Sequence, residues 1–284
     1  MKKQAQLGLI VEGKAASSAL LRLPTIAQEL GPVKSASMRV ARRFSNLLHA
    51  GYPVDDYEEL QAARLILLRV PDATVSRVVE ELSSSDLLFR KLAFGLCETW
   101  LPTDVLEPLR QRGSAVATLV SVPTVRHNWF AVEGQTSAVR QIRRLLDRND
   151  MYSTEIHAES KALLFGAELL ATVLPLSLFA AAQEALRCSG ISGKPLSALI
   201  EEMGLKMLRD FAKGTRLLWG GPLAQCSLET ANSYFENLRR SHPRLAKALD
   251  EHIERTTSSA RSEEQPRLCH PNGIASGRVG AEPL

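Results

Sequence analysis

The feature that most constrains the fold of this chain is a repeated alternation of short aliphatic runs and helical patterns between residues 7 and 150. The runs lie at 7–11, 33–38, 64–70, 91–97, 115–122 and 129–132. Helical patterns separate them at 17–30, 39–50, 74–82, 104–112 and 137–146. Strands spaced by helices of this length are typical of parallel β-α-β units with helices on both faces of the sheet. The sequence therefore predicts an α/β fold with a doubly wound parallel sheet over residues 1–152.

Beyond residue 153 the strand pattern disappears and helical patterns continue at 155–186, 195–211, 228–239 and 243–255. Pro243 suits the first position of the last helix, where a missing N–H carries no penalty. We expect an all-helical domain over 153–255, serving dimerisation or substrate binding. Residues 256–284 are rich in Ser, Gly, Pro and mixed charges, so we expect a disordered tail.

Composition narrows the possible functions. The chain has 284 residues, 45% of them hydrophobic and 23% charged, which is typical of a globular protein. Aromatic residues are only 5% and the net charge is +4, so the sequence does not favour a nucleic-acid partner. The four cysteines are far apart and the six histidines lack metal-ligand spacing, which indicates reduced thiols, no metal site and a cytoplasmic protein.

Residues 162–182 form an apolar stretch long enough to cross a bilayer. Glu168, Thr172 and Pro175 interrupt it, and a carboxylate at such a depth is costly in lipid. We expect a helix buried within a helical domain or a homodimer rather than a membrane span. Glu168 then either pairs with a basic residue across the dimer or acts on a substrate.

The junction after the first aliphatic run carries part of a phosphate-binding pattern. In G-x-G-x-x-G/A turns a diphosphate rests on backbone N–H groups at a helix N-terminus. Gly13 takes the second glycine position and Ala16 the third, whereas Val11 stands at the first and Glu12 brings a negative charge. If a dinucleotide binds, we expect its diphosphate over Gly13, Lys14, Ala15, Ala16 and Ser17. The alternative is an ordinary strand-to-helix turn that binds nothing.

The segment after the second run bears on cofactor choice. An acidic residue there favours NAD, whereas Arg accommodates the 2′-phosphate of NADP. Residues 30–54 contain no Asp or Glu but include Arg39 and Arg42. These arginines are either a 2′-phosphate site or a solvated basic helix face, and the sequence leaves both open.

Four segments carry a resemblance to a known family. The strand followed by Val70, Pro71 and Asp72 resembles the cofactor-side loop in relatives of pyrroline-5-carboxylate reductase and ketopantoate reductase. More narrowly, 104–113 (DVLEPLRQRG), 130–134 (FAVEG) and 218–223 (LWGGPL) resemble bacterial Rossmann-like proteins with the C-terminal domain of unknown function 2520. The resemblance implies an NADP-binding domain, a helical domain that dimerises and closes the cleft, and a nicotinamide half beside Val70, Pro71 and Asp72.

The chain departs from that family where the family offers polar groups to a substrate. The corresponding positions read AFGLCE at 93–98, SVP at 121–123, Lys161, Ala162 and Glu168 along the next helix, and QCS at 225–227. Two hypotheses follow. One is an NADP-dependent oxidoreductase acting on a small carbonyl or imine, with Glu168, Lys161 and Ser121 as candidates for the polarising group. The alternative is a non-catalytic, dimeric dinucleotide-binding or scaffolding protein.

Overall fold

The computed structural model describes residues 6–13, 20–122, 124, 129–213 and 226–263. The chain forms two compact units, Met1–Val173 and Leu174–Leu284. The first unit holds the sheet, its covering helices and helix α6 (Lys161–Ala171). We expected the first domain to end at residue 152. The first compact unit of the structure continues to Val173.

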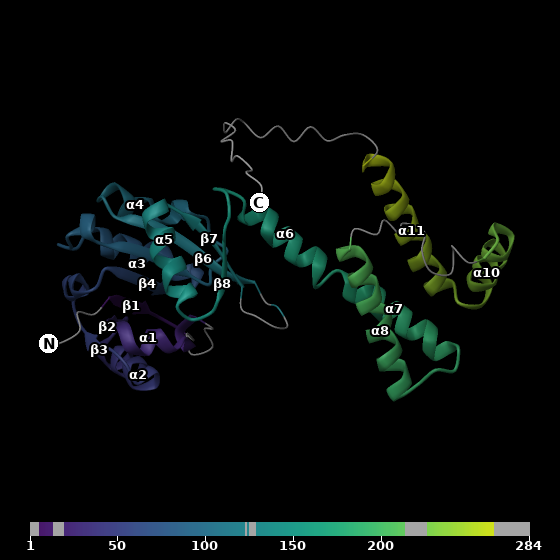
Figure 1. Ribbon diagram of the computed structural model, residues 1–284, viewed down its shortest axis with the longest axis horizontal. Helices are drawn as coiled ribbons and strands as arrows, with labels where there is room; N and C mark the ends of the chain where they lie inside the picture. Colours follow the sequence, from purple (N-terminus) through teal and green to yellow (C-terminus); the bar gives the residue numbers. More distant parts are fainter. Residues whose placement is uncertain (1–5, 14–19, 123, 125–128, 214–225, 264–284) are drawn as a thin grey trace, which may run out of the picture. The chain divides into compact units, whose positions relative to one another are not determined.

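The first unit is built on an eight-stranded sheet with the order β3-β2-β1-β4-β5-β6-β7-β8 (Figure 1). Parallel pairing runs from β3 through β6, and β1 lies between β2 and β4, so the strand order reverses at β1. This confirms the predicted doubly wound fold. The strands are β1 (Leu7–Val11), β2 (Leu30–Lys34), β3 (Tyr52–Val54), β4 (Leu65–Arg69), β5 (Ala93–Cys97), β6 (Ala115–Val122), β7 (Trp129–Gly134) and β8 (Tyr152–Glu155).

One pairing differs from the expected parallel arrangement. Strand β7 runs antiparallel to β6, with Val122 opposite Trp129, and β8 is parallel to β7. Only residues 123–128 connect β6 to β7, which is too short for the helical crossover that parallel neighbours require.

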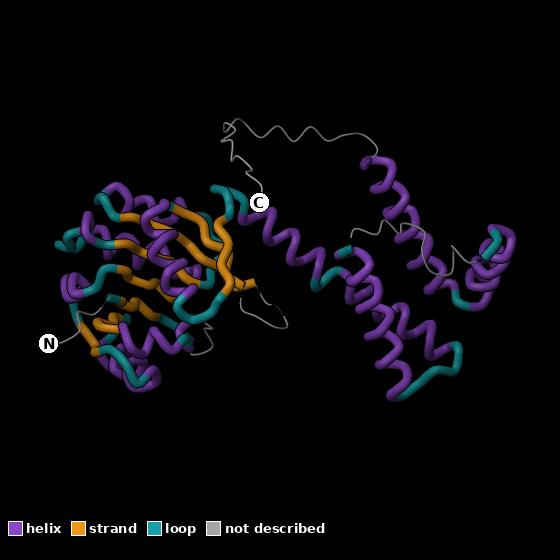
Figure 2. Tube along the Cα trace, viewed as in Figure 1, coloured by secondary structure: helices purple, strands orange, loops and turns teal. Residues whose placement is uncertain are grey.

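Helices cover both faces of the sheet (Figures 1 and 2). One buried cluster joins the sheet to α1 (Pro24–Glu29), α2 (Met38–Leu48) and α5 (Thr136–Asp147). A second cluster joins the opposite face to α3 (Asp72–Ser83) and α4 (Glu107–Gln111). Short 3-10 helices complete the unit: η2 (Leu20–Arg22), η3 (Tyr57–Ala62), η4 (Phe89–Lys91) and η5 (Thr103–Leu106).

Burial on both faces explains why the strands appear in the sequence as continuous aliphatic runs. Leu9 and Leu67 belong to one cluster and Ile10 and Leu68 to the other, and each is at most 1% exposed. Burying such a side chain stabilises the fold by roughly 1.5–3 kcal/mol. Both faces therefore select apolar residues at every position.

The sequence-based boundaries differ from the structure where pairing is weak. The second strand begins at Leu30, earlier than the expected 33–38, because Leu7 pairs with Leu30. Strands β3 and β8 were not predicted from the sequence. Both are short, and three of the four residues of β8 are exposed, so they carry little apolar signal.

The second unit is helical in its described part, as expected. Its helices are α7 (Pro175–Cys188), α8 (Lys194–Ala212), α10 (Leu228–Ser241) and α11 (Pro243–Glu263). Helix α7 contacts α8, and α10 contacts α11. Pro243 begins α11 as predicted, but α11 continues to Glu263, so residues 256–263 are helical rather than part of a disordered tail. Residues 264–284 lie outside the described part of the chain.

The apolar stretch forms two helices rather than one. Helix α6 ends at Ala171, and α7 begins at Pro175, which cannot donate the hydrogen bond that a continuing helix requires. By length and composition alone, the segment 161–188 could cross a membrane. Its most apolar stretch is 0% buried inside the structure. The expected helix buried within a helical domain or a homodimer is therefore not buried within the single chain, and its burial in a homodimer stays a prediction.

Candidate functional site

The candidate site lies at the edge of the first unit where the parallel strands end. Strands β1, β2, β4 and β5 all terminate there, and the strand order reverses at β1. In open α/β sheets, ligands bind outside the carboxyl ends of the strands at such a reversal. The residues expected to bind a cofactor follow these strands.

Gly13 brings two of the predicted segments together. Its φ of +69° lies in the left-handed region that favours glycine, and a Cβ at this position would lie 2.9 Å from Cγ of Pro71. Gly13 is exposed, so no side chain among the described residues buries it. The first turn and the Val70-Pro71-Asp72 loop thus meet at the strand edge. Lys14, Ala15, Ala16 and Ser17 lie outside the described residues.

Val11, the residue that breaks the glycine pattern, belongs to the strand and not to the turn. It ends β1, is fully buried and pairs with Arg69 of β4. Its carbonyl oxygen accepts a hydrogen bond from the Ser35 hydroxyl at 2.6 Å. A β-branched residue therefore fits here, because the tight turn begins only after it.

The negative charge of Glu12 is compensated by Arg77 of α3. Nη2 of Arg77 donates to both carboxylate oxygens of Glu12, at 2.8 and 2.7 Å, and Nη1 donates to Glu81 at 2.7 Å. Hydrogen bonding to Glu12, then to Glu81, raises the pKa of Arg77. The carboxylate next to the expected diphosphate position is thus paired, which sequence reasoning did not anticipate.

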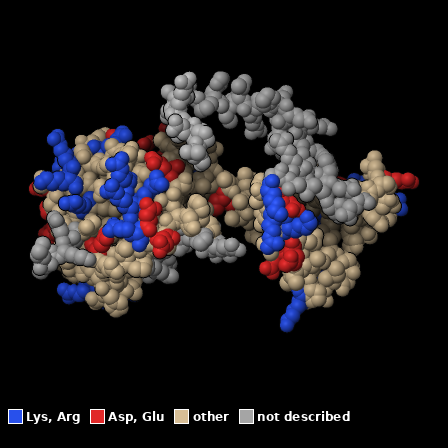
Figure 3. Space-filling view, viewed as in Figure 1, with Lys and Arg blue, Asp and Glu red and all other residues tan. Residues whose placement is uncertain are grey.

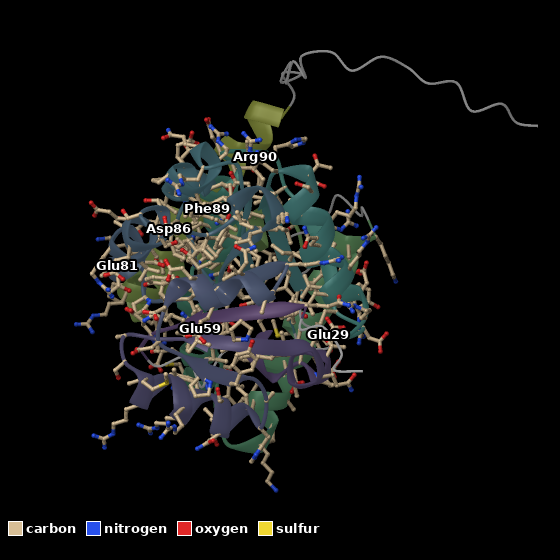
Figure 4. The ribbon with its side chains drawn as sticks, turned by 90° about the vertical axis from the view of Figure 1, so that its left-hand side faces the viewer. Glu29, Glu59, Glu81, Asp86, Phe89 and Arg90 are labelled. Carbon is tan, nitrogen blue, oxygen red and sulfur yellow. The ribbon has the colours of Figure 1, made fainter. Side chains whose placement is uncertain are left out.

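A tyrosine and a lysine extend this network toward β2. The Tyr57 hydroxyl donates to Glu81 at 2.7 Å, and Lys34 Nζ lies 5.0 Å from the Tyr57 ring centroid. Burial, followed by the hydrogen bond to Glu81, raises the pKa of Tyr57. Glu81 itself lies at the rim of the unit (Figure 4). The network fixes Lys34 at the end of β2, where an adenosine ribose would lie.

Arg39 and Arg42 lie on α2, which begins directly after this strand end. The Ser37 hydroxyl caps the helix by accepting a hydrogen bond from the Val40 N–H, so the helix N-terminus faces the end of β2. Arg39 is in the first turn and both arginines are exposed. Within the described residues neither forms an ion pair, which leaves them free for an anion.

Asp72 and Lys161 converge on Thr99, the second residue after β5. The Thr99 hydroxyl donates to Oδ1 of Asp72 at 2.9 Å and accepts from the Leu101 N–H at 3.0 Å. Lys161 Nζ donates to the carbonyl oxygens of Thr99 and Leu101, at 3.3 and 2.5 Å. Asp72 is the first residue of α3, and Pro71 is its N-cap.

Lys161 is an unusual group at this edge. It is 4% exposed, and burial lowers the pKa of its ammonium to about 8, while the nearby charges of Glu133 and Asp72 oppose that shift. A group with such a pKa exchanges protons readily near neutral pH. Of the three candidates for a polarising group, Lys161 is the one that the structure ties to Asp72.

The other two candidates are placed differently. Ser121 is half-buried near the end of β6, opposite Phe130 of β7. Glu168 is half-buried on α6, and its Oε2 is buried with no hydrogen-bond partner in the described part of the chain. Within those residues, neither side chain contacts the network of Asp72, Thr99 and Lys161.

Glu98 is a further site residue that sequence reasoning missed. It follows β5 with φ of +54°, an uncommon conformation for a residue other than glycine. Its Oε2 accepts from Arg69 at 2.7 Å, which ties the ends of β4 and β5 together. Burial raises the pKa of the neighbouring Cys97, as is usual for a thiol in apolar surroundings.

The late segment 218–223 and Gln225 lie outside the described residues. Among the described residues no group of three or more His, Cys, Asp or Glu side chains could hold a metal ion. On the face shown in Figure 3, positive and negative side chains of the first unit are interspersed.

Solved structures share this fold. A candidate NADP oxidoreductase from Bacteroides fragilis is 15% identical, with a TM-score of 0.69 over 89% of this chain and 98% of that one. An imine reductase from Myxococcus stipitatus in complex with NADP+ is 17% identical, with a TM-score of 0.61 over 89% and 94% of the two chains. A pyrroline-5-carboxylate reductase from Coxiella burnetii is 15% identical, with a TM-score of 0.56 over 90% and 98%.

No family model matches the chain, and no curated protein matches it. The narrower resemblance to proteins with the domain of unknown function 2520 therefore stays a prediction. At these identities the structural likeness shows a common fold, a Rossmann-like domain followed by a helical region.

Proposed function

We propose that this chain binds NADP(H) and acts as an oxidoreductase on a small carbonyl or imine compound. The observation that carries the proposal is the exposed Gly13, held at positive φ against Pro71 where the strand order reverses. A glycine at this position of a phosphate-binding turn lets the backbone approach a diphosphate. The solved structures named above, which include reductases of imines and of pyrroline-5-carboxylate, support the choice of reaction.

The residues present suit an adenine dinucleotide phosphate. The diphosphate would lie over Gly13 to Ser17, and the pairing of Glu12 with Arg77 reduces repulsion there. The 2′-phosphate would lie against Arg39 and Arg42, beside Lys34 and the N-terminus of α2. Val70, Pro71 and Asp72 would border the nicotinamide half.

A bound NADPH supplies a hydride, so the chain itself needs to orient the substrate and deliver a proton. We propose Lys161 for that proton because its pKa is lowered to about 8 and Thr99 links it to Asp72. Two of its N–H groups are used by carbonyl oxygens, which fixes the position of the ammonium. Ser121 and Glu168 are weaker candidates because neither contacts this network.

The second candidate function is a non-catalytic dimeric protein that binds a dinucleotide or acts as a scaffold. Buried Cys97 follows Leu96 where the family resemblance implies a polar substrate contact, and this favours the alternative. Binding of NADPH without any turnover of carbonyl or imine substrates would support it.

We propose that the protein is a cytoplasmic homodimer and that its apolar helices form the interface. Leu163 and Leu170 of α6 are 76% and 66% exposed, and Phe211 of α8 is 80% exposed. Monomeric proteins rarely expose so many large apolar side chains on neighbouring turns. A second copy that covers them would also explain why the segment 161–188 is as apolar as a membrane-spanning helix.

A titration tests the cofactor proposal. The chain purified without detergent is titrated with NADPH and with NADH while intrinsic fluorescence and melting temperature are followed. Ligand that binds the folded state raises the melting temperature by mass action. We expect NADPH to raise it more than NADH, and light scattering to give the mass of a dimer. A melting temperature unmoved by about 1 mM NADPH would contradict the proposal.

A further inference from the structure

A cavity of about 560 Å³ lies in the first unit, beside the pairing of β6 and β7. Its walls include Val116 near the start of β6 and Gly134 at the end of β7. Because β6 begins where its parallel neighbours also begin, these walls lie toward the edge opposite Gly13. The volume is in the range of pockets that bind small molecules.

The cavity wall is strongly acidic. Its charged side chains are one arginine and five carboxylates, Asp104, Glu107, Glu133, Glu155 and Glu159. Arg110 is paired with Glu107 at 2.6 Å and thus compensates only that carboxylate. The wall as a whole favours a positively charged occupant.

Glu133 gives the site an unsatisfied buried acceptor. The residue is 4% exposed, and its Oε1 accepts a hydrogen bond from the Glu159 N–H at 3.0 Å. Its Oε2 is buried and has no partner among the described residues. A buried carboxylate oxygen without a donor costs free energy that a bound cation would recover.

Lys161 does not supply the missing donor to Glu133. Lys161 contributes to the electrostatics around Glu133, but its Nζ donates to the carbonyl oxygens of Thr99 and Leu101. Within the described residues no ion pair joins Lys161 to Glu133, and no cluster of metal-ligating side chains occurs. An organic cation therefore suits the cavity better than a metal ion.

Apolar groups line the rest of the cavity. Val116, Ile156, Ala158 and Pro102 offer contacts to carbon. We propose that this cavity binds a small protonated alkyl amine, with its ammonium group at Glu133 and its alkyl chain against these residues. Glu133 lies close enough to act on the charge of Lys161. The amine site nevertheless does not rest on the proposed function, because its binding is tested without nucleotide.

Calorimetric titration of the full chain, free of nucleotide, with hexylamine, hexan-1-ol and hexanoate tests the proposal. The three probes share one alkyl chain and differ in charge. We expect saturable binding of hexylamine, at least about tenfold weaker binding of the alcohol, which is about 1.4 kcal/mol, and none of the carboxylate. Equal binding of amine and alcohol, or no binding of the amine, would overturn the proposal.

Variants locate the site. Glu133→Gln keeps the shape of the side chain and removes its charge. We expect this variant to bind hexylamine at least about tenfold more weakly. Glu80→Gln, an exposed change on α3 outside the cavity, should leave the affinity unchanged. If Glu133→Gln does not fold, Glu155→Gln, an exposed change in the cavity wall, replaces it and should still weaken the amine. Unchanged affinity in the folded wall variant would show that the amine binds elsewhere.

Discussion

The Thr99 hydroxyl donates a hydrogen bond to Oδ1 of Asp72 across 2.9 Å and so joins the end of β5 to the first residue of α3. The same hydroxyl accepts from the Leu101 N–H, and Thr99 is only 1% exposed. Replacing Thr99 with Val would leave both partners without their bond. We expect a loss of about 1–3 kcal/mol in the free energy of unfolding, measured by urea denaturation.

Thr74→Val provides a matched control for that change. Its hydroxyl also donates to one acceptor, the Pro71 carbonyl oxygen, but the residue is partly exposed and water can replace the bond. We expect a loss below about 1 kcal/mol. Equal losses for the two variants would show that the bond between Thr99 and Asp72 stabilises the fold no more than an exposed hydrogen bond does.

Gly13→Ala should destabilise the fold for two separable reasons. The φ of +69° is unfavourable for alanine by about 1–2 kcal/mol, and the new Cβ would lie 2.9 Å from Cγ of Pro71. Adding Pro71→Ala should relieve the close contact and so recover the stability lost to it. The loss caused by the unfavourable φ should remain. Gly166→Ala, at a helical site with nothing within 4 Å, should be neutral or stabilising in the same denaturation experiment. A Gly13→Ala protein as stable as Gly166→Ala would refute the turn geometry.

Lys161 gives the stability a specific pH dependence. Burial lowers its pKa from 10.5 to about 8, so between these values the unfolded chain holds a proton that the folded chain has released. The free energy of unfolding of the wild type should therefore rise with pH over this window, relative to Lys161→Met, by on the order of 2 kcal/mol. Below pH 8 the two curves should run parallel. Curves that run parallel across the whole pH range would show that folding does not lower the pKa of Lys161.

Arg39→Ala tests the choice between the two nicotinamide cofactors. Arg39 has no ion pair among the described residues and lies in the first turn of α2. Its removal should therefore weaken the binding of NADPH by about tenfold and leave the binding of NADH unchanged. Arg143→Ala, an exposed change on α5, is the control and should alter neither. Equal losses of NADPH and NADH in Arg39→Ala would discard the 2′-phosphate assignment.

The strands that could be predicted are those buried on both faces. The runs at 7–11 and 115–122 match β1 and β6 because β1 is buried throughout and β6 is buried from Val116 to Val120. Strands β3 and β8 lie at the edges of the sheet, where pairing rather than burial forms the strand, so their residues carry no apolar pattern. The direction of β7 depended on the length of a connection and not on its composition.

The site divides in the same way. Local turn chemistry predicted Gly13, and the family resemblance implied the Val70-Pro71-Asp72 loop. The structure places Pro71 of that loop beside Gly13. Arg77 and Thr99 were missed because their partners are distant in the sequence, Glu12 by 65 residues and Asp72 by 27. Such pairs become visible only when the sheet sets neighbouring strand ends side by side.

Hydrogen exchange with and without NADPH tests the central claim most directly. Amides protected by a ligand identify the surface that it covers. We expect slower exchange in three segments that meet at one strand edge: Val11 to Gly13, Ser35 to Arg39, and Val70 to Asp72. NADPH that leaves these segments unprotected, or that protects only residues far from this edge, would contradict the assignment of a dinucleotide site.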